Sequence, residues 1–164
     1  LTVSTRGAQG KRPDESGPAI ETLVQDRLGA RIAQRRMIPD RQPDIEAILA
    51  EWADGDAMDL ILTTGGTGFA PSDVTPEATR RVIDREAPGL VEAIRAASLK
   101  VTPHAMLSRA VAGIRGRTLI VNLPGSPKAV RESLEVILPV LPHAIALLRE
   151  TPGEDERHAP ETAR

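Results

Sequence analysis

Two short aliphatic runs, residues 59–63 (Asp-Leu-Ile-Leu-Thr) and 118–121 (Thr-Leu-Ile-Val), are each followed at once by a glycine-containing loop and then by a helical pattern. Such runs are typical of strands buried on both faces, as in parallel sheets covered by helices. With one Phe, one Trp and no Tyr, the core must be aliphatic. The alternation predicts an α/β fold, a three-layer α/β/α arrangement around a mostly parallel sheet.

The same alternation extends along the rest of the chain. Residues 1–4 and, more weakly, 31–38 are further predicted strands. Helical patterns cover residues 16–28, 45–54, 75–87, 90–99 and 128–149. Gly29 ends the first of these helices, Pro88-Gly89 breaks the pattern after the third, and Pro139 and Pro142 interrupt the last. Residues 101–109 fit no element clearly, and the glycine- and proline-containing stretches between elements are predicted loops.

The length of 164 residues suits one domain, which we assign to residues 1–149. Residues 150–164 are charged and almost free of apolar side chains, which predicts a disordered tail. The first residues resemble the end of a strand, so we expect the natural chain to begin before Leu1.

Composition excludes several classes of function. The net charge is −2 with acidic and basic residues interleaved, so no basic patch for nucleic acid is expected. The absence of Cys excludes disulfides and thiolate zinc sites, and the three His residues lack metal-ligand spacing. No apolar run is long enough to cross a membrane and no signal peptide is visible, so we expect a cytoplasmic protein without a membrane partner.

Ligands of open α/β sheets bind beyond the carboxyl ends of the strands. Three predicted loops leave strands in that direction, at Pro39-Asp40, at residues 63–73 and at residues 122–127. The middle loop carries Gly65, Gly66, Thr67 and Gly68, whose backbone amides could approach a phosphate closely. It is neither a Walker A loop nor a Rossmann fingerprint. A tight structural turn explains these glycines about as well.

Two acidic residues accompany these loops, Asp40 and Asp73. Mg²⁺ is commonly held by one or two protein carboxylates together with substrate phosphate oxygens, which makes the two acids candidate metal ligands. Each also has an ordinary structural explanation, since Asp40 follows Pro in a turn and Asp73 precedes a helix start.

The third loop holds Asn122, Pro124, Gly125 and Ser126, whose amides could bind a purine or a phosphate. A plain structural turn is the alternative. Ser108 and the adjacent Arg109 could supply a hydroxyl and a cation to an anionic ligand, although a solvated surface pair is the more common explanation.

The sequence from residue 63 to residue 79, Thr-Thr-Gly-Gly-Thr-Gly-Phe-Ala-Pro-Ser-Asp-Val-Thr-Pro-Glu-Ala-Thr, resembles the signature of the molybdopterin adenylyltransferase family, which includes the bacterial Mog-type proteins and the gephyrin G domains. Further segments resemble the family in the same order: residues 14–18, 38–40, 88–90, 102–109, 112–116 and 122–127.

This resemblance implies the three-layer α/β fold of molybdenum cofactor biosynthesis proteins and a homotrimer. It implies transfer of AMP from Mg-ATP to molybdopterin with release of pyrophosphate. Asp40 and Asp73 match the family's critical carboxylates, and the loops at Gly65–Gly68 and Asn122–Ser126 match the border of the nucleotide. The region of Ser108 matches the pterin side, and other proteins of the same biosynthesis are expected partners.

Two positions depart from the family's usual pattern. Thr5 stands where the family usually has Asp, and Ser72 stands where a basic residue often precedes the second acid. Alternatives to the adenylyltransferase are a scaffold protein that binds the pterin without turnover and a competence-damage-type enzyme with another substrate. A molybdate-inserting domain is a further one, but this chain is too short for that multidomain architecture.

Overall fold

The computed structural model describes residues 1–55 and 57–150, so the predicted tail lies outside the described residues from position 151 on. The strands are β1 (Thr2–Val3), β2 (Met37–Ile38), β3 (Leu60–Thr64), β4 (Arg85–Glu86), β5 (Ala112–Arg115) and β6 (Thr118–Leu123). The helices are α1 (Thr5–Ala8), α2 (Ser16–Leu28), α3 (Gln42–Asp54), α4 (Thr75–Val82), α5 (Pro88–Leu99), α6 (Pro127–Ile137) and α7 (Leu141–Arg149), with a 3-10 helix η1 (Pro103–Leu107). None of the helices within these ranges is long and apolar enough to span a bilayer.

The six strands form one sheet in the order β2-β1-β3-β6-β5-β4. The first four strands in this order are parallel, while β5 runs antiparallel to both of its neighbours. The central pair, β3 and β6, aligns Ile61 with Ile120 and Thr63 with Asn122. The prediction of a mostly parallel sheet is confirmed.

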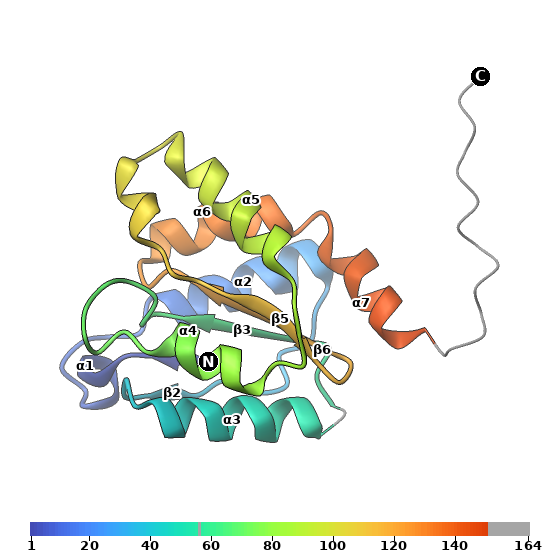
Figure 1. Cartoon of the computed structure of the whole chain (residues 1–164), viewed down its shortest axis with the longest axis horizontal. Coiled ribbons are helices and arrows are strands. Elements are labelled where there is room, and N and C mark those ends of the chain that lie inside the picture. Colours follow the sequence, from blue (N-terminus) through green and yellow to red (C-terminus); the bar gives the residue numbers. More distant parts are fainter. Residues whose placement is uncertain (56, 151–164) are drawn as a thin grey trace.

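Helices cover both faces of the sheet, as Figure 1 shows. Side chains of β3 and β6 alternate between two apolar clusters, because successive residues of a strand point to opposite faces. Ile61 and Ile120 pack with α3 and α4 on one face. Leu62 and Val121 pack with α2, α5, α6 and α7 on the other. The three-layer α/β/α arrangement is therefore confirmed.

Several predicted boundaries were wrong. Only Met37–Ile38 of the predicted strand 31–38 joins the sheet. Pro88 begins α5 rather than breaking a helix, because a proline at the first helical position loses no hydrogen bond. Strands β4 and β5 were not predicted, and β6 continues through Asn122 and Leu123, which were assigned to a loop.

Candidate active site

The four parallel strands end at one edge of the sheet. There β1 has β2 on one side and β3 on the other, so the chain reverses its direction of winding between β1 and β3. Ligands of doubly wound sheets bind at such a switch point. A cleft of about 580 Å³ lies at this edge, within the size range of small-molecule sites. Its lining includes Thr5, Asp40, Gly65, Gly66, Gly125 and Ser126.

The glycine-rich loop needs glycine at its first two positions. Gly65 and Gly66 have φ angles of 92° and 63°, a region that side chains disfavour. A Cβ at Gly65 would lie 2.3 Å from the carbonyl oxygen of Val3 in β1. The Gly65 amide already donates to Leu123 at 3.3 Å, and within the described part of the chain no hydrogen bond occupies the amides of residues 66–68. Of these three residues only Gly66 lines the cleft, whereas Thr67 is buried and Gly68 lies outside the cleft lining.

Asp40 follows β2 and enters the cleft beside this loop. Its Oδ2 accepts hydrogen bonds of 2.7 Å from both the backbone amide and the hydroxyl of Thr5. Its Oδ1 lies 3.2 Å from the position that a Cβ of Gly66 would take. One carboxylate oxygen is therefore fixed, and the other faces the glycine-rich loop.

Asp73 lies at the other end of the same loop. Its Oδ2 accepts a 3.0 Å hydrogen bond from the Ala70 amide and lies 2.8 Å from the Cβ position of Gly68. It lines a separate, shallow hollow with Phe69 and Arg109, whereas its neighbour Ser72 lines the cleft of Asp40. The two predicted acids thus flank one loop but do not line one cleft in this structure.

Arg109 holds the glycine-rich loop through hydrogen bonds to its carbonyl oxygens. Its Nε donates to the carbonyl oxygen of Gly68 at 2.7 Å, its Nη2 donates to the carbonyl of Asp73, and its Nη1 forms an ion pair with Glu77. Its backbone amide donates to the carbonyl of Thr67 at 2.9 Å. The prediction of a solvated surface residue or ligand cation missed this role, which no local sequence signal indicates.

The environment of Glu77 reflects the same contact. Burial raises its pKa, but the hydrogen bond from Arg109, the helix backbone, and the charges of Arg109 and Arg80 together outweigh burial. The net effect holds the pKa of Glu77 below its usual value of 4.5. Glu77 is therefore ionised at neutral pH and neutralises the guanidinium under the loop.

The prediction that the Asn122 amide faces a ligand is corrected by the structure. Asn122 is 1% exposed inside β6. Its Oδ1 accepts from the Val111 amide at 3.1 Å, and its Nδ2 donates to Thr63 at 3.0 Å and Thr79 at 2.9 Å. Both polar atoms of its side chain are hydrogen-bonded inside the protein. Asn122 therefore links β6 to β3 and α4 and does not contact solvent.

Of the remaining predicted residues, some line the cleft and others lie outside it. Gly125 packs against Gly65, since a Cβ there would lie 3.3 Å from the Gly65 Cα, and Ser126 caps α6 through the Ala129 amide at 3.2 Å. The Pro124 carbonyl accepts from the Thr64 hydroxyl at 2.7 Å. Ser108 follows η1 and does not line the cleft.

The residues present fit a magnesium ion that is completed by substrate. The described ranges contain no group of three or more His, Cys, Asp or Glu side chains that could enclose a metal. Mg²⁺ does not need such a cage, because it keeps water and binds through one or two carboxylates plus phosphate oxygens. The Oδ1 of Asp40, which accepts no hydrogen bond among the described residues and lies beside Gly66, suits that requirement.

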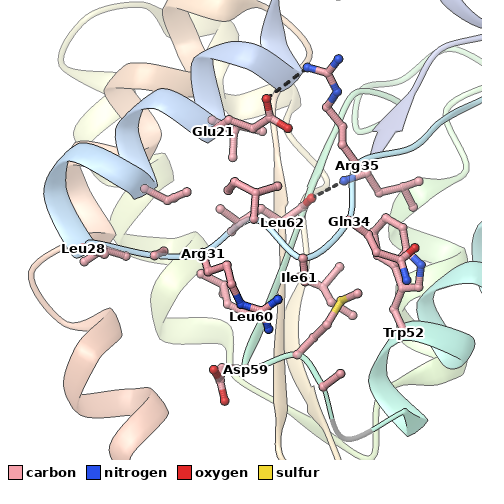
Figure 2. Close-up of a pocket in the computed structure, with 18 of the residues that line it drawn as sticks. Glu21, Leu28, Arg31, Gln34, Arg35, Trp52, Asp59, Leu60, Ile61 and Leu62 are labelled. Carbon is pink, nitrogen blue, oxygen red and sulfur yellow. Dashed lines mark hydrogen bonds and ion pairs between the residues drawn. The ribbon is translucent and has the colours of Figure 1, made fainter.

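A second cavity, of about 480 Å³, opens at the opposite edge of the sheet, where the strands begin. Figure 2 shows it between α2, residues 28–35 and the start of β3, with Trp52 on one side and the ion pair of Glu21 and Arg35 across one end. None of the predicted site residues lines it. The cleft at the carboxyl edge is therefore the candidate active site.

Comparison with known proteins decides the family. Residues 1–143 match the family model described as "Probable molybdopterin binding domain". The chain belongs to this molybdopterin-binding domain family.

Relatives within the molybdopterin-binding domain family cover nearly the whole chain. It is 42% identical over 149 residues to a molybdopterin adenylyltransferase of Helicobacter pylori, covering 90% of this chain and 85% of the relative. It is 44% identical to gephyrin of Dictyostelium discoideum over 161 residues, covering 93% of this chain but only 22% of gephyrin. The chain thus spans about a fifth of that longer relative.

A solved structure agrees with the fold of this family member. The crystal structure of the molybdopterin biosynthesis enzyme MoaB from Thermus thermophilus superposes with a TM-score of 0.84 at 54% identity, covering 93% of this chain and 95% of that chain. The three-layer fold of molybdenum cofactor biosynthesis proteins is therefore the fold of this chain.

Proposed function

We propose that this protein is a molybdopterin adenylyltransferase, which transfers AMP from Mg-ATP to molybdopterin and releases pyrophosphate. The observation that carries the proposal is the Asp40 carboxylate facing Gly66 in a cleft at the sheet's switch point. It occurs in a chain 42% identical to a protein named for this activity.

In the proposed reaction, a terminal phosphate oxygen of molybdopterin attacks the α-phosphorus of ATP. A new P–O bond forms while the bond from the α-phosphorus to the bridging oxygen breaks, and its electron pair leaves with pyrophosphate. The attacking phosphate is already anionic, so no strong base is needed. Catalysis is then mainly positioning and neutralisation of charge.

The predicted site residues, inside the cleft and beside it, have distinct tasks in this proposal. The amides of residues 66–68 bind phosphate oxygens, while Gly125 and Ser126 border the nucleotide. Asp40 would hold Mg²⁺, and the bound ion would supply positive charge against the triphosphate. Asp73 is the second proposed carboxylate; its Oδ2 accepts from the Ala70 amide and it lines the neighbouring hollow at the other end of the same loop. Ser108 orients the incoming phosphate from the pterin side.

We also propose that the protein acts as a cytoplasmic homotrimer that meets other proteins of molybdenum cofactor synthesis. Phe69 and Met106 support an interface, since these large apolar residues are 66% and 63% exposed on the single chain.

The test compares wild type with Asp40→Asn and Asp73→Asn in an assay of pyrophosphate release and AMP-molybdopterin formation. Both substitutions should reduce turnover at least a hundredfold while molybdopterin binding stays within about threefold. Asp26→Asn, an exposed residue of α2, is the matched control and should behave as wild type. Full turnover of either variant would refute its role as a metal ligand. Wild-type binding of molybdopterin without pyrophosphate release would favour a scaffold instead.

A further inference from the structure

Thr5 and Asp40, which both line the cleft, are joined by several hydrogen bonds. Thr5 begins α1 one residue beyond β1, after the N-cap Ser4, and Asp40 follows the neighbouring strand β2. Three hydrogen bonds join them: the Thr5 amide and hydroxyl donate to Asp40 Oδ2 at 2.7 Å each, and the Asp40 amide donates to the Thr5 hydroxyl at 3.0 Å. Parallel pairing of β1 with β2 brings the two residues together.

These bonds determine the orientation of both side chains. The Asp40 amide can only donate, so the Thr5 oxygen must accept there and direct its own hydrogen to Oδ2. Oδ2 then holds two donors, which leaves Oδ1 as the oxygen directed toward the Gly66 position. A carboxylate on a freely rotating side chain would have to be ordered when it binds a cation. The conformational entropy lost in that step would lower its affinity for the cation.

We infer that Thr5 is a positioning residue that holds the Asp40 carboxylate with Oδ1 toward the cation and phosphate subsite. The inference rests on the proposed function, which it deepens. Thr5 does not touch the substrate in this role and acts through Asp40 alone. Its hydroxyl and amide supply two neutral donors to the Asp40 carboxylate.

The hydroxyl and the side-chain volume of Thr5 can be separated by substitution. Thr5→Val keeps the shape and removes the hydroxyl, whereas Thr5→Ser keeps the hydroxyl and removes the methyl group. Thr22→Val, on an exposed turn of α2 outside the cleft, is the matched control. Thermal unfolding of each variant shows that it is folded, and Thr5→Ala takes the place of Thr5→Val if the latter does not fold.

The first readout is binding of Mn²⁺ with a non-hydrolysable ATP analogue, measured by titration calorimetry without molybdopterin. Thr5→Val should weaken this binding about tenfold, because a hydrogen bond to a charged group is lost. Thr5→Ser should stay within about twofold of wild type. The second readout is the Mg²⁺ concentration for half-maximal turnover, which should rise about tenfold in Thr5→Val and return in Thr5→Ser.

Two results would overturn the inference: equal Mn²⁺-nucleotide affinity in Thr5→Val and wild type, or an equal loss in Thr5→Ser and Thr5→Val. Neither result touches the proposed function if wild type forms AMP-molybdopterin. Conversely, a wild type that binds the metal–nucleotide pair but forms no product defeats the adenylyltransferase, while the binding comparison still decides the role of Thr5.

Discussion

The Nε of Arg109 donates a 2.7 Å hydrogen bond to the carbonyl oxygen of Gly68, across 41 residues of sequence. Together with its bonds to the carbonyls of Thr67 and Asp73, this contact fixes the curvature of the glycine-rich loop. The Arg109 side chain therefore helps to set the orientation of the loop amides that are proposed to bind phosphate. Arg109 is a positioning residue whose charge is neutralised by Glu77.

Replacing Arg109 with Lys should impair the loop although the positive charge is kept. A lysine cannot reproduce the fork of donors that reaches two carbonyls and a carboxylate together. We expect turnover to fall at least tenfold and the free energy of unfolding to fall by about 1–3 kcal/mol. Steady-state kinetics and urea unfolding measure the two effects. Wild-type behaviour of Arg109→Lys would mean that charge alone matters here.

Acid should weaken the fold partly through Glu77. Because the folded pKa of Glu77 is lowered from 4.5, its contribution to stability is present above pH 4.5 and is lost as pH falls through the folded pKa. Glu77→Gln should therefore destabilise the protein at pH 7 more than at pH 3. Urea unfolding of both proteins across this range is the measurement, and a pH-independent difference would contradict the assignment.

Asn122 should matter for stability rather than for ligand binding. Asn122→Ala removes three hydrogen bonds and leaves buried partners on Val111, Thr63 and Thr79. We expect a loss of about 2–4 kcal/mol in the free energy of unfolding. In a cycle with Thr79→Val, the two losses should couple by about 1 kcal/mol. A loss of nucleotide affinity in a fully stable Asn122→Ala protein would restore the original prediction of ligand contact.

Two glycine-to-alanine substitutions distinguish a position where the backbone requires glycine from one where it does not. Gly65→Ala places a Cβ 2.3 Å from the Val3 carbonyl at a φ of 92°, so it should destabilise by about 3 kcal/mol or more and reduce nucleotide binding. Gly89→Ala, in the first turn of α5 with no atom within 4 Å of the new Cβ, should leave stability unchanged or slightly raised. Thermal unfolding of both variants decides the matter.

The layered fold was predictable because its signals are local. The aliphatic runs now in β3 and β6 predicted the central strands, and the interruption near Pro139 separates α6 from α7 as expected. Strands β4 and β5 gave no such signal, because Arg85–Glu86 is exposed at the sheet edge and β5 contains Gly113 and Arg115. β5 pairs with β6 and β4 pairs with β5, and this pairing cannot be predicted from the residues of either short strand alone.

The candidate site was predictable to the level of loops but not of side-chain direction. The positions of the loops after the strands predicted one shared edge for five residues, and the structure brings these into one cleft: Asp40, Gly65, Gly66, Gly125 and Ser126. The sequence alone could not show that Asn122 points inward or that Arg109 turns toward carbonyl oxygens. Both outcomes depend on partners more than ten residues away, so they follow from packing and not from spacing.

The order of the strands has a consequence for how the protein matures. Thr5, Asp40, Gly66 and Ser126 leave four different strands and meet only when β2, β1, β3 and β6 have all paired. Contacts so distant in sequence raise the contact order and slow folding. A growing polypeptide on the ribosome would thus lack the complete cleft until its last parallel strand had been synthesised.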